Sequence, residues 1–310
     1  MRARQPDSTG RIDCDGVEIY YELHGDEGPT ILLLPTWMII HSRFWKLQVP
    51  YLARHFRVIT YDSPGNGKSD RPLDPKAHGV YAHLRYTEAV LDEVGVDRAV
   101  LVGLSAGGSF GLSFAAEHPD RVLGLALIGP ATPVLKSGPS ERRRFINAHF
   151  DLPYPQMAPS RVSIGVRDDP GDWNKYNRQY WIDELEDFGW FFFGHCFPEP
   201  HSTKQIEDCA GWTMETTGEL LGAEADAPDG DVDTYRDWAS LVGCPALLIH
   251  GSDDYIVPIS VSEELARLTG GDLVRLQGSG HIPNAREPVK VNFLLKDFVD
   301  RAAAPMVGSS

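Results

Sequence analysis

The sequence predicts an α/β fold in which a mostly parallel central sheet is covered by helices on both faces. Two observations lead to this prediction. Short apolar runs, of the kind found in strands buried on both faces, alternate along the chain with segments of helical periodicity. One long segment without strand-like alternation interrupts this order, and we expect it to form a helical lid inserted between two core strands. The 310 residues, 42% of them hydrophobic, suffice to bury such a core.

Seven segments are expected to be strands. The first, at residues 16–23, alternates apolar and polar side chains, as a strand at the edge of a sheet does. The others are apolar runs at residues 30–34, 56–61, 99–102, 122–128, 246–250 and 273–276. Helices are expected at residues 86–94, 110–117, 260–268 and 289–301. Because helices separate the apolar strands, the strands are expected to pair in parallel through crossover connections.

Residues 133–240 differ in character from the rest of the chain. They contain about half of its aromatic side chains, including five of the seven tryptophans, and their 20 acidic residues outnumber 10 basic ones. Helices are expected there at residues 172–188 and 203–221, followed by a mobile acidic loop at residues 222–233. A helical insertion rich in aromatic residues is typical of a lid over a pocket, but the same rings could equally fill a small core of the lid.

These patterns divide the chain into three kinds of segment. The core is expected at residues 11–132 and 241–302, the helical cap (lid) at residues 133–240, and flexible tails at residues 1–10 and 303–310. Residues 1–10 lack the apolar centre of a signal peptide, so a cytoplasmic protein is expected. The longest apolar run, at residues 31–40, is too short to cross a bilayer.

Composition also restricts the expected partners. The net charge of -15 argues against nucleic acid and against an anionic membrane surface. The four cysteines are scattered, which indicates free thiols, and neither a metal site nor a cofactor is indicated by any motif. We therefore expect a small-molecule substrate as partner, and the sequence leaves a homo-oligomer open.

A candidate nucleophile follows the expected strand at residues 99–102. Residues 103–107 (GLSAG) place Ser105 between this apolar run and a helix, with small residues on either side. This is the pattern of a nucleophile elbow, a sharp turn that lifts one hydroxyl above the end of a buried strand. The same pattern recurs around Ser109, but that residue lies one turn inside the expected helix, where a hydroxyl usually bonds to a carbonyl. Ser105 is therefore the expected nucleophile.

A serine needs a base to take its proton and a third group to orient that base. Asp253 and Asp254 follow the expected strand at residues 246–250, and His281 follows the next strand. Side chains at the carboxyl ends of neighbouring parallel strands meet at one edge of the sheet, so these groups are expected to converge with Ser105. By position alone, either aspartate could orient the histidine.

Together these motifs resemble those of the α/β-hydrolase superfamily, in particular its lidded serine hydrolases, which include esterase-, lactonase- and haloperoxidase-like proteins. The resemblance covers residues 15–131 and 241–302. It includes residues 61–70 (YDSPGNGKSD), which are similar to the turn that follows the second core strand in that family.

The resemblance implies a role for each residue of a catalytic triad. Ser105 is implied as the nucleophile and His281 as the base. Asp254 is implied as the acid, because two residues lie between it and a Val-Pro pair, as they do for the acid in that family. Relatives that open epoxides or displace halide carry an aspartate at the elbow. The serine of this chain therefore implies acyl chemistry.

An oxyanion site is implied as well. The amide of Ala106, at the start of the elbow helix, is the first expected donor, and the amide of Trp37 is the second. Relatives have His-Gly before the aromatic residue at the latter position, whereas this chain has Pro-Thr before Trp37. Thr36, Met38 and Leu104 are expected to contact the substrate.

The sequence thus predicts a serine hydrolase that cleaves an ester, lactone or thioester of a small-to-medium apolar substrate through an acyl-enzyme. The same triad would serve an acyltransferase, a carbon–carbon hydrolase or a cyclase, and the residues alone do not separate these activities. An alternative of another class is a receptor that binds a ligand on the same fold without catalysis, which the altered loop before Trp37 would favour.

Overall fold

An eight-stranded sheet forms the centre of the computed structural model, which describes residues 4–136, 149–151, 172–200 and 203–304. The strands are β1 (Ser8–Cys14), β2 (Val17–His24), β3 (Thr30–Leu33), β4 (Arg57–Tyr61), β5 (Ala99–Leu104), β6 (Val122–Ile128), β7 (Ala246–Gly251) and β8 (Asp272–Leu276). Their order across the sheet is β1-β2-β4-β3-β5-β6-β7-β8. All pairs from β4 to β8 are parallel, and β1 and β2 add an antiparallel edge, which confirms the expected mostly parallel sheet.

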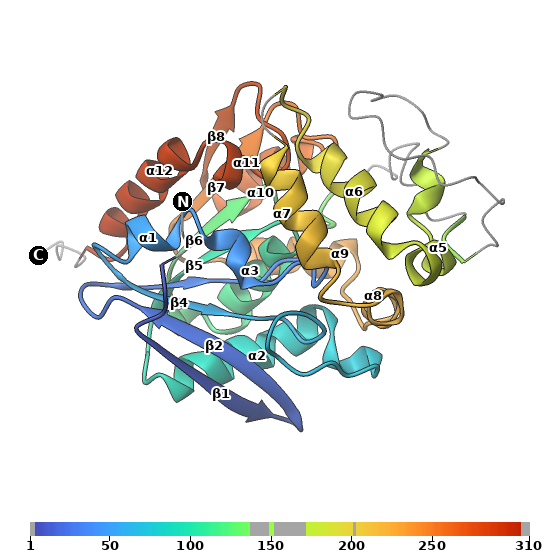
Figure 1. Cartoon of the computed structure of the whole chain (residues 1–310). Coiled ribbons are helices and arrows are strands. Elements are labelled where there is room, and N and C mark those ends of the chain that lie inside the picture. Colours follow the sequence, from blue (N-terminus) through green and yellow to red (C-terminus); the bar gives the residue numbers. More distant parts are fainter. Residues whose placement is uncertain (1–3, 137–148, 152–171, 201–202, 305–310) are drawn as a thin grey trace, which may run out of the picture.

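Helices cover both faces of this sheet (Figure 1). One face carries α2 (Gly79–Glu93), α3 (Ala106–Glu117), α9 (Val232–Leu241) and α10 (Ser260–Thr269), and the other carries α1 (Val49–Leu52) and α12 (Pro288–Ala302). Short helices lie in the connections: η1 (Ser42–Trp45), η2 (Pro75–Ala77), η3 (Pro119–Arg121) and α11 (Pro283–Arg286). Within the described ranges, no helix is both long enough and apolar enough for a membrane span.

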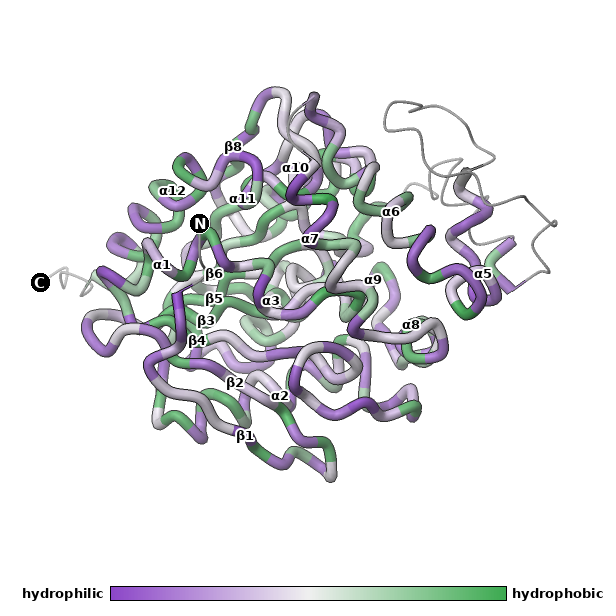
Figure 2. Tube along the Cα trace, in the orientation of Figure 1, coloured by the Kyte–Doolittle hydropathy of each residue, from purple (hydrophilic) through white to green (hydrophobic). Residues whose placement is uncertain are grey.

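Alternate residues of the central strands pack against opposite helix layers. In β3, the side chains of Ile31 and Leu33 belong to the apolar cluster that contains Leu295 of α12. Leu32, between them, belongs to the cluster that contains Leu112 of α3. All five side chains are fully buried, and Figure 2 shows the central strands as the most hydrophobic part of the trace. The continuous apolar runs of the sequence are therefore explained by burial on both faces.

The described part of the chain between β6 and β7 is helical, but its helices differ from the expected ones. They are η4 (Asp172–Lys175), α5 (Arg178–Asp183), α6 (Leu185–Cys196), α7 (Lys204–Thr213) and α8 (Gly218–Ala225), followed by α9. The helix expected at residues 172–188 is divided because Asn177 caps α5, with its side chain accepting two backbone amides. The helix expected at residues 203–221 is divided at Thr217, whose hydroxyl caps α8 in the same way.

Helix α9 lies inside the range expected to form the cap, yet it packs on the core. Trp238 Nε1 donates to Glu117 Oε1 of α3 at 2.6 Å, and Arg236 pairs with a glutamate of α10 at 2.7 Å. The loop expected at residues 222–233 is also shorter than expected, because α8 extends into it and Asp231 caps the start of α9. The acidic residues of this segment therefore include a helix cap, a role for which aspartate is well suited.

Strand β1 begins at Ser8, inside the segment expected to be a tail. It pairs antiparallel with β2, from Ser8 opposite Leu23 to Cys14 opposite Val17. Ile12 is its one buried side chain. Backbone pairing with β2 holds this strand in place, and it buries a single side chain. Its sequence therefore lacks the apolar pattern from which strands are predicted.

Glycines allow β5 and α3 to cross at very short distance. A Cβ atom added at Gly103 would lie 2.1 Å from the carbonyl oxygen of Gly107, and one added at Gly107 would lie 2.3 Å from the carbonyl oxygen of Pro35. The obstacles are backbone atoms in both cases, so they cannot move aside as a side chain could. This crossing holds the start of α3 against the end of β5 and the loop that follows β3.

We predict that Gly103→Ala lowers the free energy of unfolding by about 1–3 kcal/mol, because the new methyl group would separate strand from helix. Gly211→Ala, in α7, is the matched control: its Cβ would meet no atom within 4 Å, and we expect a gain of about 0.4–1 kcal/mol. Urea denaturation measures both changes. Equal midpoints for Gly103→Ala and the wild type would contradict the argument.

Candidate active site

Ser105 stands between β5 and α3 in a strained backbone conformation. Its φ of 53° and ψ of -117° are unusual for any residue other than glycine. Its amide donates to the carbonyl of Ile128 at 3.0 Å, and its own carbonyl accepts the amides of Gly108 and Ala131 at 2.8 and 3.0 Å. These three bonds fix the turn, so the hydroxyl is held at the end of β5.

The structure brings together three side chains that the sequence singled out. His281 Nε2 lies 2.9 Å from Ser105 Oγ, and His281 Nδ1 lies 2.8 Å from Asp254 Oδ2. An ionised carboxylate only accepts hydrogen bonds, so the imidazole proton is on Nδ1, and Nε2 is left to accept the serine proton. The three residues follow β5, β7 and β8, whose carboxyl ends meet at one edge of the parallel sheet.

Of the two candidate aspartates, Asp254 faces His281. Its side chain is 1% exposed. Asp253 is exposed and accepts a hydrogen bond from the hydroxyl of Ser252 at 2.8 Å. Burial alone would raise the pKa of Asp254, but the charge of His281 and the hydrogen bonds from His281 and His250 outweigh burial and hold this pKa below its ordinary value.

The second serine of the repeated elbow pattern, Ser109, is turned away from these groups. Its hydroxyl donates to the carbonyl of Ala131 at 3.3 Å and lies 3.4 Å from Thr132 Oγ1. It therefore ties α3 to the chain that follows β6.

The loop that carries His281 is bonded to the segment after α6. The amide of His281 donates to the carbonyl of Cys196 at 3.0 Å, and the amide of Gly280 donates to Glu199 Oε1 at 2.7 Å. Glu199 also forms an ion pair with Arg286, and both side chains are more than nine-tenths buried. Sequence reasoning missed this link, because Glu199 and Arg286 are 87 residues apart and belong to no motif.

A pocket opens beside Ser105 and His281. Its other lining residues are Thr36, Trp37, Ile39, Ile40, Leu104, Phe192, Phe193, Cys196 and Ile282. Thr36 and Leu104 thus lie where substrate contacts were expected. Met38 does not line this pocket: its side chain lies against Gly65, and its sulfur is 3.6 Å from Thr216 Oγ1. Among the residues that the structure describes, no Lys, Arg, Asp or Glu lines the pocket, so this part of its surface suits an uncharged group.

The ring of Trp37 lies in a cluster of aromatic side chains. Its centroid is 5.1 Å from that of Phe192, 5.7 Å from Trp181, 5.8 Å from Tyr176 and 6.1 Å from Phe188. Sequence reasoning assigned a role to the backbone of Trp37 alone. The structure shows that its side chain joins the loop after β3 to α5 and α6.

The two expected oxyanion donors are both without an acceptor among the described residues. Neither the amide of Trp37 nor that of Ala106 donates a hydrogen bond there. Ala106 is the first residue of α3, where the helix dipole favours a negative charge. These amides are therefore available to a ligand.

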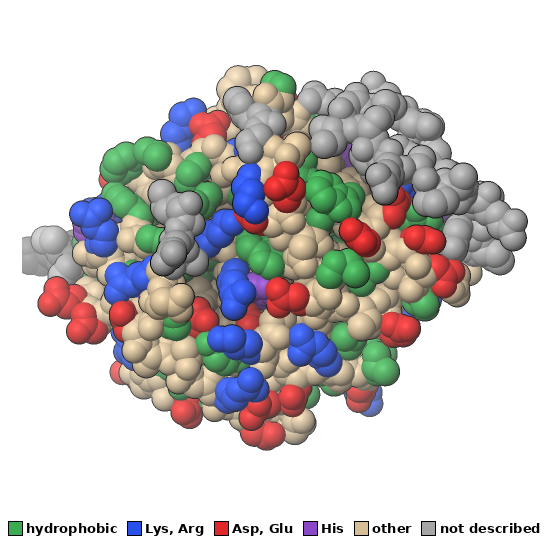
Figure 3. Space-filling view, viewed as in Figure 1, with side chains coloured by type: hydrophobic (Ala, Val, Ile, Leu, Met, Phe, Trp, Pro, Cys, Tyr) green, Lys and Arg blue, Asp and Glu red, His purple; other side chains and the backbone are tan. Residues whose placement is uncertain are grey.

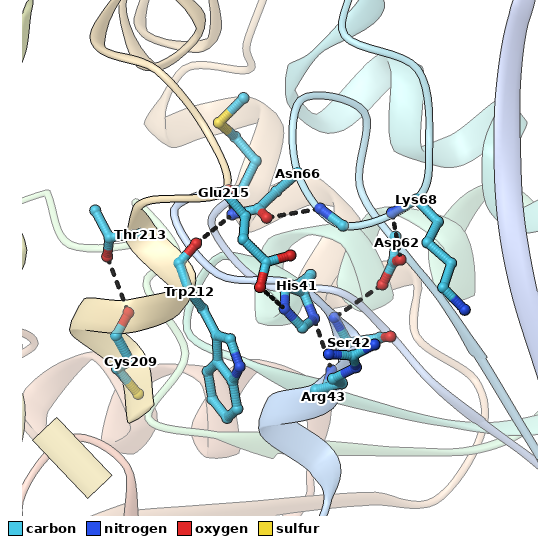
Figure 4. A network of polar contacts seen from close by, with 12 residues as sticks. His41, Ser42, Arg43, Asp62, Asn66, Lys68, Cys209, Trp212, Thr213 and Glu215 are labelled. Atoms are coloured by element: carbon cyan, nitrogen blue, oxygen red, sulfur yellow. Dashed lines mark hydrogen bonds and ion pairs between the residues drawn. The ribbon is translucent and has the colours of Figure 1, made fainter. Parts of the chain in front are cut away.

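The chain that follows Trp37 is fastened to the turn between α7 and α8 (Figure 4). His41 Nε2 lies 3.4 Å from Glu215 Oε1. Asn66 Nδ2 donates to the carbonyl of Met38 at 2.8 Å and to that of Trp212 at 3.3 Å. These contacts hold the loop after β3 and the helices beyond β6 in one arrangement.

The surface around these contacts carries both signs of charge (Figure 3). Lys46 forms an ion pair with Asp208, and Lys68 lies over the ring of Tyr20 at 4.3 Å. The acidic excess of the chain therefore does not make this face uniformly negative.

Comparisons with known proteins agree with this fold. A family model described as alpha/beta hydrolase fold matches residues 29–150. The bromoperoxidase of Bacillus anthracis superposes with a TM-score of 0.74 at 22% identity, covering 94% of this chain and 100% of that one. These likenesses show that the chain has the alpha/beta hydrolase fold.

The chain is also similar to two proteins whose names state a hydrolytic activity. The enol-lactonase of Burkholderia xenovorans LB400 superposes with a TM-score of 0.72 at 21% identity, covering 94% of this chain and 99% of that one. A RutD protein of Caulobacter sp. (strain K31), whose name proposes carbamate hydrolysis, is 29% identical over 92% of this chain and 97% of its own length. Structural likeness at such identity shows the fold.

A buried carboxyl group lies next to the loop that holds Trp37. Glu224, in α8, has its Oε2 buried without a hydrogen-bond partner in the described ranges. Burial raises the pKa of Glu224 to about 8, although the amide of Met38 and the side chain of Trp37 oppose this rise. Glu224 is therefore protonated at neutral pH in the folded protein.

We predict that this group makes the folded state less stable as pH rises from about 4.5 to about 8, since the unfolded chain releases the proton that the folded chain keeps. Glu224→Gln is always neutral and should remove this part of the pH dependence. Urea midpoints at about pH 5 and about pH 9 measure it. Glu219→Gln, at an exposed position of the same helix, is the control and should follow the wild type; the same behaviour in Glu224→Gln would refute the prediction.

Proposed function

We propose that this protein is a serine hydrolase that cleaves an ester, lactone or thioester of a small-to-medium, uncharged and apolar substrate through an acyl-enzyme on Ser105. The observation that carries the proposal is the hydrogen-bonded chain from Ser105 through His281 to Asp254 beside an apolar pocket. The similarity to proteins whose names state lactone or carbamate hydrolysis supports hydrolysis as the class of reaction.

In the proposed reaction, Ser105 Oγ attacks the carbonyl carbon while His281 Nε2 takes the hydroxyl proton. His281 then gives this proton to the departing alkoxide or thiolate, which leaves the acyl group on Ser105. Water attacks the acyl-enzyme with His281 again as base, and the acid and free serine are released. Asp254 keeps the imidazole proton on Nδ1 and offsets the charge of the imidazolium.

The negative oxygen formed during each attack needs donors already in position. We assign this role to the amides of Ala106 and Trp37, because both lack an acceptor in the described chain and lie close to Ser105 in the fold. Such a donor is typically worth about 3–4 kcal/mol to the transition state. The Pro-Thr that precedes Trp37 does not remove its amide, so this departure from the family pattern is compatible with catalysis.

The helices between β6 and α9 are proposed to form the cap over the pocket. Phe192, Phe193 and Cys196 of α6 line the pocket opposite the loop after β3. The contacts of α9 with α3 and α10 support grouping that helix with the core, so the cap is proposed to end before Val232.

We predict that a fluorophosphonate adds once to the wild-type protein and not to Ser105→Ala, because only a serine activated by His281 attacks phosphorus readily. Ser109→Ala is the matched control: it removes a serine one helical turn away whose hydroxyl faces the chain after β6, and it should be labelled like the wild type. Intact-mass spectrometry measures the adduct. A wild type that stays unlabelled, yet binds apolar esters without turnover, would favour the receptor alternative instead.

We further predict that neutral acyl groups react faster than charged ones of equal length. With p-nitrophenyl butyrate and the p-nitrophenyl monoester of succinic acid, kcat/KM should differ by at least about 100-fold, since the described lining of the pocket offers no cation to a buried carboxylate. Initial rates of nitrophenol release measure the ratio. A ratio near one would remove the preference for uncharged substrates from the proposal while leaving hydrolysis itself intact.

A further inference from the structure

A second histidine contacts the carboxylate of Asp254, the proposed catalytic acid. His250, in β7, is completely buried. Its Nε2 lies 3.2 Å from Asp254 Oδ2 and 3.1 Å from the carbonyl oxygen of Val257, and its Nδ1 lies 2.7 Å from Ser262 Oγ in α10. From the sequence, His250 at the end of an apolar strand is expected to be a packed residue near the site, but its partner could not be predicted.

The neighbours of His250 decide where its proton lies. The carboxylate of Asp254 and the carbonyl of Val257 can only accept hydrogen bonds, so Nε2 carries a proton and donates to them. A neutral ring then accepts the hydroxyl proton of Ser262 at Nδ1. Every polar atom of this buried imidazole is thus satisfied, which is the condition for a polar side chain in a core.

With His250 included, four donors surround the carboxylate of Asp254. Its Oδ1 accepts the amides of Ile256 and Val257 at 2.8 Å each. Its Oδ2 accepts His281 at 2.8 Å and lies 3.2 Å from His250. A carboxylate offers about four lone-pair positions, so all are occupied and rotation of the group would break several bonds at once.

We propose that His250 is a positioning residue that holds Asp254 Oδ2 in place. This oxygen is the same one that accepts the hydrogen bond from His281. The inference rests on the proposed function, in which Asp254 orients the base. His250 touches neither the pocket nor Ser105, so it acts through Asp254 alone. The bond from Ser262 fixes the imidazole ring, and the carboxylate is thereby anchored to α10.

Sharing one oxygen has a consequence for the base. The donor from His250 reduces the negative charge that Asp254 Oδ2 presents to His281, so it moderates how strongly the pair binds a proton. Among the described residues, His281 and His250 are the titratable groups that bear on Asp254. On α10, which packs beside β7, Glu263 pairs with Arg275 at the exposed surface instead.

The test compares His250→Leu, which removes the donor, with His250→Gln, whose side-chain amide can still donate to Asp254. In His250→Leu we expect kcat to fall at least about tenfold with little change in KM, because the base is less well oriented. The acid limb of kcat/KM should move up by about half to one pH unit, as expected for the loss of one donor to a carboxylate. His250→Gln should restore most of both effects.

A second readout does not depend on turnover. NMR of protein labelled at the histidine ring carbons follows the titration midpoint of His281 in the unliganded protein, and this midpoint should rise in His250→Leu by the same amount as the acid limb. An unchanged midpoint in a folded His250→Leu variant would overturn the inference. The midpoint of His281 could rise in His250→Leu as expected while the wild type neither hydrolyses esters nor reacts with a fluorophosphonate. That result would refute the proposed function, and the role of His250 on Asp254 would still stand.

If His250→Leu does not fold, the wild-type protein still decides. Nitrogen chemical shifts of the His250 ring report which nitrogen carries the proton. A proton on Nε2 alone supports the inference, and a neutral ring with its proton on Nδ1 contradicts it, because Nε2 could then donate nothing to Asp254.

Discussion

The close crossing of β5 and α3 is the constraint on which the rest of the site depends. Glycines at positions 103 and 107 let backbone approach backbone, and the turn between the two elements forces Ser105 into a conformation with positive φ. The strain is offset by three backbone hydrogen bonds of Ser105, one with α3 and two with the end of β6 and the chain after it. Since the same crossing presses Gly107 against Pro35, it also sets the distance between the elbow and the loop that holds Trp37.

The parts of the fold that follow from local rules could be predicted from the sequence. Strands buried on both faces leave continuous apolar runs, and the order of serine, aspartate and histidine places Ser105, Asp254 and His281 at one edge of a parallel sheet. Prediction was poorer at the ends of helices, where single side chains decide the outcome. Asn177 and Thr217 end and restart helices through single side-chain caps, and the acidic segment before α9 resembles a loop because its aspartate acts as a cap.

The contacts that hold the site together were the least predictable, since they join distant segments through residues outside any motif. Glu199 binds the amide before His281, and His250 reaches Asp254 from inside a strand. Each is an ordinary polar contact whose partners meet only after the chain has folded. A sequence motif indicates which groups of a site react, but it says much less about the polar contacts that hold those groups in position.

Trp37 combines two positions in one residue. Trp37 lines the pocket and its amide has no acceptor among the described residues, while its ring lies among Tyr176, Trp181, Phe188 and Phe192. If the amide of Trp37 binds the oxyanion as proposed, a bulky acyl group that pushed this ring would also turn the peptide to which the ring is attached. A substrate that fits poorly would then lose stabilisation of the oxyanion, so the protein would discriminate between bound substrates by the rate at which they react.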